Sequence, residues 1–250
     1  MRRETFATEG PVRISVKLAA GRVELETAET AEAVVELEPL NDRARQAVED
    51  ALVELRGGEL RVDVDQKRFL LMGRTPEVRV TVRAPSGSSA QVASAAAEIS
   101  GRGRFGEIDV KTAAGDVEFD DVERDATVNA VSGDVRIGSI GGEAAVKSVS
   151  GDVLIEQLAR GGRVQTVSGD VALEALTEGK LAVKTVSGDV RAGIRRGSGL
   201  WIDAKSVSGK TTSDLELGDE APAEPGPLVE LQAASVSGDI RVVRASSVSA

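Results

Sequence analysis

The 250-residue sequence predicts an all-β protein that folds as a parallel β-helix, or β-solenoid, with coils of roughly 18 residues. The pentapeptide Val-Ser-Gly-Asp-Val recurs along the chain, and the aspartates at 116, 134, 152 and 170 are separated by 18 residues each time. Apolar and polar residues alternate after each copy, which is typical of short strands. The full copies span 131–135, 149–153, 167–171, 186–190 and, with isoleucine closing it, 236–240; weaker copies span 113–117 and 207–211.

The composition favours thin, evenly layered packing. Hydrophobic residues make up 41% of the chain, yet it has only four Phe, one Trp and no Tyr, so the core must be aliphatic. The chain has no His and no Cys, which excludes Ser–His–Asp and Cys–His nucleophilic sites, the usual zinc sites and disulfides. The formal net charge is −10, which disfavours nucleic-acid binding, and we expect the acidity to serve solubility.

Two regions are expected along the chain. Residues 1–90 are predicted to form an N-terminal strand region that continues into the regular solenoid repeats of residues 91–245. Within the first region, apolar residues at helical spacing predict one short helix over residues 42–56. Asn41 or Asp42 would cap its start and Gly57-Gly58 would end it. We expect this helix to cover a flank or an open end of the strand stack.

Two segments interrupt the strands. Residues 67–74 are predicted to be a loop whose apolar cluster, Phe69–Met72, is buried. The acidic, proline-rich residues 219–227 are predicted to be a surface loop. The last strand, 240–243, has only a short polar tail after it, so we expect its edge to be exposed at the end of the solenoid.

Each repeat supplies two or three short strands. After each aspartate comes an apolar run such as Val135, Ile137 and Ile140, whose first two members share one face of a strand and whose third marks a corner. A second strand, such as Val146–Val149, returns to the next Ser-Gly-Asp. Stacking places equivalent residues ~4.8 Å apart and closes a core that no single repeat could bury. The crossover preference favours a right-handed coil, and the apolar recurrence every six residues that a left-handed coil of hexapeptides needs is missing.

The Ser-Gly-Asp corners are interpreted as structural turns. Glycine adopts positive φ without steric cost, and Ser or Asp can bond to backbone groups at a bend. The alternative is a column of calcium sites, but known calcium solenoids use a denser glycine pattern at shorter spacing. We assign no catalytic, cofactor or metal-binding residues. The structural turn residues are Ser132, Gly133, Asp134, Ser150, Gly151, Asp152, Ser168, Gly169, Asp170, Ser187, Gly188, Asp189, Ser237, Gly238 and Asp239.

The repeated Val-Ser-Gly-Asp-Val, with the Val-x-Ser or Val-x-Thr before it, resembles the bacterial β-strand-repeat family known as putative adhesins, a domain of unknown function. The resemblance covers most of the chain and is strongest over residues 105–243. It implies a β-solenoid, and the family has no agreed catalytic residues. Relatives in that family occur as membrane-anchored or envelope-stress-associated proteins. This sequence shows no export signal, anchor or membrane span, so we expect a cytoplasmic member.

Three functions are compatible with these observations. The leading hypothesis is a non-enzymatic solenoid that binds a protein partner or acts as a scaffold, because the repeat is uniform and chemical residues do not cluster. One alternative is a self-polymerising, cytoskeleton-like scaffold joined through the exposed edges at its ends. The other is a glycan-acting β-helix enzyme, which would use repeated carboxylates such as Asp152 with lysines such as Lys147, but lacks aromatic residues for sugar stacking.

Overall fold

The computed structural model describes residues 1–64, 75–215 and 226–245. It contains two compact units, of which the first holds residues 1–123 and 128–133 and the second holds residues 124–127 and 134–250. The boundary between them crosses strand β10 (Ala126–Ser132). The predicted loop at 67–74, its apolar cluster Phe69–Met72 and most of the loop at 219–227 lie outside the described residues. The proposed division into residues 1–90 and 91–245 stays a prediction.

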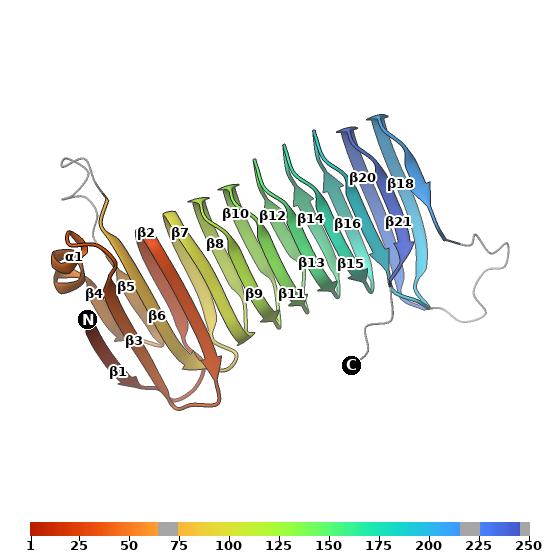
Figure 1. Ribbon diagram of the computed structural model, residues 1–250. Coiled ribbons are helices and arrows are strands. Elements are labelled where there is room, and N and C mark those ends of the chain that lie inside the picture. Colours follow the sequence, from red (N-terminus) through yellow and green to blue (C-terminus); the bar gives the residue numbers. More distant parts are fainter. Residues whose placement is uncertain (65–74, 216–225, 246–250) are drawn as a thin grey trace. The chain divides into compact units, whose positions relative to one another are not determined.

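Unit 2 consists of two rows of parallel strands, which confirms the predicted β-solenoid. The first row holds β11 (Val135–Ile140), β13 (Val153–Leu158), β15 (Val171–Leu176), β17 (Val190–Ile194), β21 (Ile240–Arg244) and β19 (Thr211–Ser213). The second row holds β12 (Ala144–Lys147), β14 (Gly161–Gln165), β16 (Gly179–Lys184), β20 (Leu228–Ser237) and β18 (Gly199–Ser208). Within each row, neighbours pair in the order given, and Figure 1 shows the second row side by side in this order.

Equivalent apolar residues of unit 2 stack in columns. Val135 pairs with Val153, Val153 with Val171, Val171 with Val190, and Val190 with Ile240. All five are buried. Because each side chain covers the one on the coil before it, short strands that could not bury a core alone share a continuous aliphatic interior.

The last coil in the sequence is not the last coil in space. Strand β21 pairs with β17 on one side and with β19 on the other, and β20 likewise lies between β16 and β18. The expectation that residues 240–243 form the exposed terminal strand is therefore wrong. Among the described residues, the terminal coil of unit 2 consists of β18 and β19, which come earlier in the sequence than β20 and β21.

Unit 1 begins with antiparallel pairs and continues as a parallel solenoid. Its strands are β1 (Arg2–Ala7), β2 (Arg13–Ala28), β3 (Glu32–Pro39), β4 (Leu52–Arg56), β5 (Glu59–Asp63), β6 (Glu77–Pro85), β7 (Ser89–Phe105), β8 (Ile108–Ala114) and β9 (Val117–Val122). The long strands β2 and β7 pair in parallel along most of their length. Strand β3 lies antiparallel between β1 and β6, and β4 is antiparallel to β5.

The helix is shorter than predicted. Helix α1 spans Ala44–Asp50, and Asn41 Oδ1 accepts the Ala44 N–H at 3.0 Å. Residues 52–56, which the helical spacing included, instead form the strand β4. Gly57 and Gly58 both have positive φ and join β4 to β5 as a two-residue hairpin turn, so they do not end the helix. The apolar spacing of residues 52–56 is compatible with a helix and with an edge strand. Gly57 and Gly58 favour the strand, because together they form the hairpin turn to β5.

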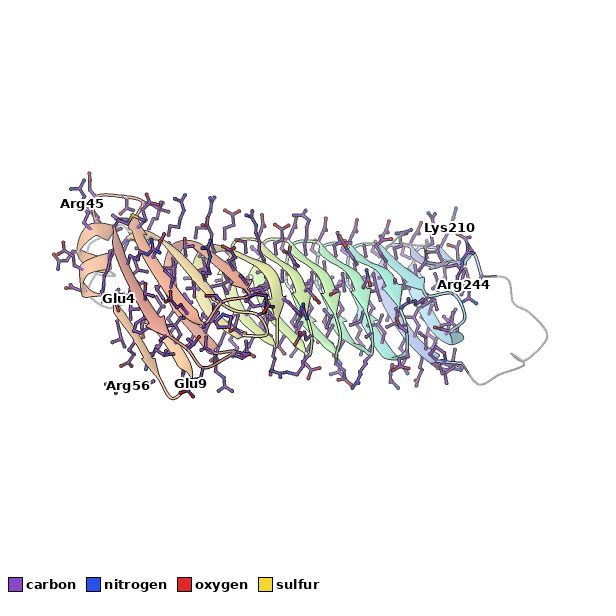
Figure 2. All side chains as sticks on the ribbon, turned by 90° about the horizontal axis from the view of Figure 1, so that it is seen from below. Glu4, Glu9, Arg45, Arg56, Lys210 and Arg244 are labelled. Atoms are coloured by element: carbon purple, nitrogen blue, oxygen red, sulfur yellow. The ribbon has the colours of Figure 1, made fainter. Side chains whose placement is uncertain are left out.

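Charged groups cover the outer strands of unit 1. Arg2 Nη1 donates to the carbonyl oxygens of Val48 at 3.2 Å and Ala51 at 2.6 Å, where helix α1 ends. These carbonyls have no partner within the helix, so the guanidinium joins β1 to the helix end. Figure 2 shows Glu4, Arg45 and Arg56 projecting from this part of unit 1.

Candidate binding surface

The five stacked corners of unit 2 depend on glycine. Each corner is the turn that follows a strand of the second row, and we call the five together the stacked corner. In spatial order they span residues 148–152, 166–170, 185–189, 235–239 and 206–210. Gly169 has φ of 138°, and a Cβ built there would lie 2.2 Å from the Gly151 carbonyl oxygen. Gly188 repeats this arrangement above Gly169, with φ of 144°. Gly169 and Gly188 must therefore both adopt positive φ and let two backbones approach closely.

The aspartates of the corner form a ladder of hydrogen bonds. The Asp170 N–H donates to Asp152 Oδ1 at 2.8 Å, and the Asp189 N–H donates to Asp170 Oδ1 at 2.8 Å. The same bond joins Asp152 to Asp134, Asp239 to Asp189, and Lys210 to Asp239. We call Asp134, Asp152, Asp170, Asp189 and Asp239 the aspartate ladder. Each carboxylate holds the backbone of the next coil in space, which is a structural task.

We expect Asp170→Ala to lower the free energy of unfolding by about 1 kcal/mol, because the Asp189 N–H loses its partner to water. Asp170→Asn keeps an oxygen at the same place and removes a like charge, so its stability should match the wild type. Denaturant titration of both variants measures the difference. Equal losses in the two variants would show that the charge, and not the hydrogen bond, matters.

The first residues of the corners form a column of hydroxyl side chains, which are buried in every corner except that of the terminal coil. Ser148, Thr166, Thr185 and Ser235 are about 5% exposed, and their side chains face the interior. The Oγ1 atoms of Thr166 and Thr185 have no hydrogen-bond partner. At the terminal coil, Ser206 Oγ donates to the Gly238 carbonyl oxygen at 2.8 Å. The column thus contains both satisfied and unsatisfied hydroxyls.

We expect Thr185→Val to leave the free energy of unfolding unchanged or to raise it by up to about 1 kcal/mol, because valine has the same shape without the unpaired hydroxyl. Ser206→Ala, which removes a 2.8 Å bond, should lower it by about 1 kcal/mol. Thermal unfolding of both variants gives the comparison. A clear loss of stability in Thr185→Val would reveal a partner for this hydroxyl.

The first valine of each motif points outward. Val149, Val167, Val186 and Val236 are each about half exposed, and Val207 is 83% exposed. We call these five residues the valine column. Their place in the strand that leads to the corner was predicted from the sequence, but their exposure was not. The signal was available, because strict alternation from Val146 puts Ser148 inside and Val149 outside.

Polar columns flank the valines. On the strand side, the outward residues preceding the valines include Lys147, Lys184 and Lys205, all exposed. On the corner side lie the exposed serines Ser150, Ser168, Ser187 and Ser237, which bridge successive coils through their backbones, and then the aspartate ladder. The predicted turn residues Ser132 and Gly133 belong to unit 1, where Gly133 packs against Gly115.

The arrangement offers little for chemistry. Within the described ranges, no three acidic, His or Cys residues lie close enough together to hold a metal ion. Among its described residues, unit 1 has an open groove of about 650 Å³ whose lining includes Asn41 and Glu77. Another open groove, of about 370 Å³, has a lining that includes Lys17, Arg61, Asp109 and Lys111. Its charges are of both signs, and Lys111 Nζ lies 3.5 Å from Asp109 Oδ2. In the part of the chain that the structure describes, no helix is long and apolar enough to cross a bilayer.

Comparison with known families decides the relationship. The Toastrack DUF4097 model matches residues 12–243, which is nearly the whole chain. The chain belongs to the Toastrack DUF4097 family. This confirms the resemblance to a family of solenoid repeats. No protein of curated function matches the chain.

Solved structures align with most of the chain at low identity. A putative adhesin from Parabacteroides distasonis has 10% identity and a TM-score of 0.55, over 96% of both chains. A putative adhesin from Bacteroides fragilis has 10% identity and a TM-score of 0.45, over 96% of both chains. A putative lipid binding protein from Parabacteroides distasonis has 12% identity and a TM-score of 0.45, over 97% of this chain and 96% of its own. The first of these establishes that the Toastrack fold of this chain also occurs in a solved structure.

Proposed function

We propose that this Toastrack protein is a non-enzymatic solenoid that binds a protein partner through the valine column. The observation that carries the proposal is the outward row of five valines on successive coils. Single exposed apolar residues are common on soluble proteins, whereas a continuous exposed row marks an interaction site. The aspartate ladder and the corner glycines hold this row at a regular spacing of ~4.8 Å.

The surroundings of the valine column support a protein interface. Exposed lysines lie on one side and serines and aspartates on the other, which gives an apolar centre with a polar rim. A binding role agrees with the name of the putative adhesin that has the same fold. We further propose that the repeated Val-Ser-Gly-Asp-Val is the feature by which this chain resembles those proteins. The cytoplasmic location and the absence of nucleic-acid binding stay predictions.

The glycan-acting alternative is supported by no specific feature of the corner. Oδ1 of each ladder carboxylate accepts a hydrogen bond from a backbone N–H of the next coil, and the carboxylates lie in a single column. A hydrolytic site needs two carboxyl groups that face each other across a bound sugar. We therefore assign the carboxylates to structure.

Crosslinking in cells followed by mass spectrometry tests the proposal. Val167→Glu with Val186→Glu places two charges in the valine column, and we expect this variant to lose the partners that the wild type captures. Ala145→Glu with Ala182→Glu places the same charges in an outward column that is not next to the valine column, and this variant should keep the partners. The proposal fails if both variants capture the wild-type set, or if both lose it while remaining folded by Trp201 fluorescence.

A further inference from the structure

None of the described residues forms a strand beyond the terminal coil of unit 2, which therefore has a long unpaired strand edge. Among the described residues, β18 pairs with β20 and has no strand on its other side. Strand β18 is 10 residues long and contains no proline, and its Trp201 is 50% exposed. The outer strands of unit 1 differ, because β4 has 5 residues and β1 begins with two arginines and carries Glu4. Short, charged edges resist pairing with other chains, and a long apolar edge invites it.

The sequence of β18 is complementary to itself when it runs antiparallel about Ala204. Residues 203 and 205 then face each other across the two strands, so Asp203 of each copy lies opposite Lys205 of the other. Likewise, Trp201 of each copy lies opposite Val207 of the other. These four residues all point outward in the register with β20, so the facing side chains share one face of the sheet. Opposite charges and aromatic–β-branched pairs are the favourable cross-strand combinations.

We propose that two copies of this chain form a two-fold dimer in which β18 pairs antiparallel with β18 of the second copy, centred on Ala204. Within one copy, Lys205 Nζ lies 3.0 Å from Asp203 Oδ1, and the dimer turns two such pairs into a network of four charges. The three residues of β19, Thr211–Ser213, are exposed and polar and add little apolar contact. The pairing is therefore assigned to β18. It goes beyond the proposed partner binding and does not depend on it.

The corner of the terminal coil favours a closed dimer over a filament. Every coil that is followed by another in unit 2 carries an aspartate whose Oδ1 accepts an N–H from the next coil. The terminal coil has Lys210 at this position, which Figure 2 shows at the end of unit 2. A lysine side chain cannot accept that bond. A copy stacked head to tail would lack the ladder contact, whereas a two-fold partner presents no corner there.

Light scattering and sedimentation equilibrium of the full-length protein test the dimer. We expect a concentration-dependent mass that approaches twice 26.0 kDa. Asp203→Lys and Lys205→Asp each place like charges opposite one another and should weaken dimerisation about tenfold or more. An equimolar mixture of the two variants restores opposite charges at every facing pair and should regain the wild-type affinity. Lys184→Asp, on the covered strand β16, is the matched control and should not change it.

Three results would overturn the proposal: a monomer at all concentrations, a dimer insensitive to both single variants, or a mixture that does not regain affinity. The register has a second readout, since the chain has no cysteine. Asp203→Cys mixed with Lys205→Cys should form a disulfide between copies, because facing Cβ atoms in an antiparallel pair lie ~5 Å apart. The Val167→Glu, Val186→Glu variant should still dimerise, so failure of partner binding and failure of the dimer are distinguishable.

Discussion

Gly188→Ala is expected to lower the free energy of unfolding by about 3 kcal/mol or more. Gly188 has φ of 144°, a conformation that costs a residue with a side chain roughly 1–3 kcal/mol. A Cβ there would also lie 2.2 Å from the carbonyl oxygen of Gly169, and the backbone shift needed to relieve such overpacking costs roughly 1–3 kcal/mol. Denaturant unfolding followed by the fluorescence of Trp201, the only tryptophan, reports on unit 2 directly.

Gly197→Ala is the matched control. Gly197 also has positive φ, 87°, but a Cβ there would meet no atom within 4 Å. Its substitution should cost only the conformational part, roughly 1–2 kcal/mol. If the two variants lose the same stability, the close approach of successive coils at Gly188 contributes nothing.

The regular part of the solenoid could be predicted because one physical requirement recurs at every coil. A strand pair that buries Val153 and Ile155 must be followed by a turn that returns the chain, and Ser-Gly-Asp occupies that turn in every coil of unit 2 except the terminal one. Alternation with a period of two then fixes which side chains enter the core. The aspartates were predicted to lie at turns, but sequence alone did not show that each carboxylate of the aspartate ladder holds the next coil.

The order of the last coils could not be predicted from repeat spacing. Backbone pairing depends on which strand edge is free and not on the order of the repeats along the chain. Strands β20 and β21 follow β18 and β19 in the sequence, yet they pair between these strands and the coil of β16 and β17. The weaker repeat at 207–211 held the relevant signal. Lys210 replaces an aspartate that only a following coil needs, and Thr211 replaces a core valine that only a following coil would cover. Degeneration of the motif thus marks the end of the stack.

The partial exposure of the valine column was not predicted from the sequence either. A valine such as Val167 is usually counted as core, since apolar residues favour burial. In this corner the buried positions go to Thr166 and its equivalents, and the valines take the outward positions. The register of the strand predicts that these valines point outward, whereas hydrophobicity alone predicts that they are buried. The candidate binding surface depends on their outward orientation.

Phe119→Ala is expected to lower the free energy of unfolding by about 3–5 kcal/mol, because it removes a fully buried ring from the core. Phe119 is 1% exposed and meets Phe105 edge to face, with ring centroids 5.2 Å apart. Denaturation followed by circular dichroism reports on the whole chain, while Trp201 fluorescence follows unit 2. The ring lies in unit 1, so we expect the change in circular dichroism to precede the change in fluorescence.

A double-mutant cycle with Gly101 tests whether the ring of Phe119 fits because Gly101 has no side chain. Gly101 pairs with Phe119 across β7 and β9, and a Cβ at Gly101 would lie 2.2 Å from Phe119 Cδ1. Gly101→Ala alone should therefore cost about 1–3 kcal/mol through overpacking. In a Phe119→Leu background the smaller side chain leaves room, and the same substitution should cost at least about 1 kcal/mol less. Additive losses would show that Gly101 is required by the backbone and not by the ring.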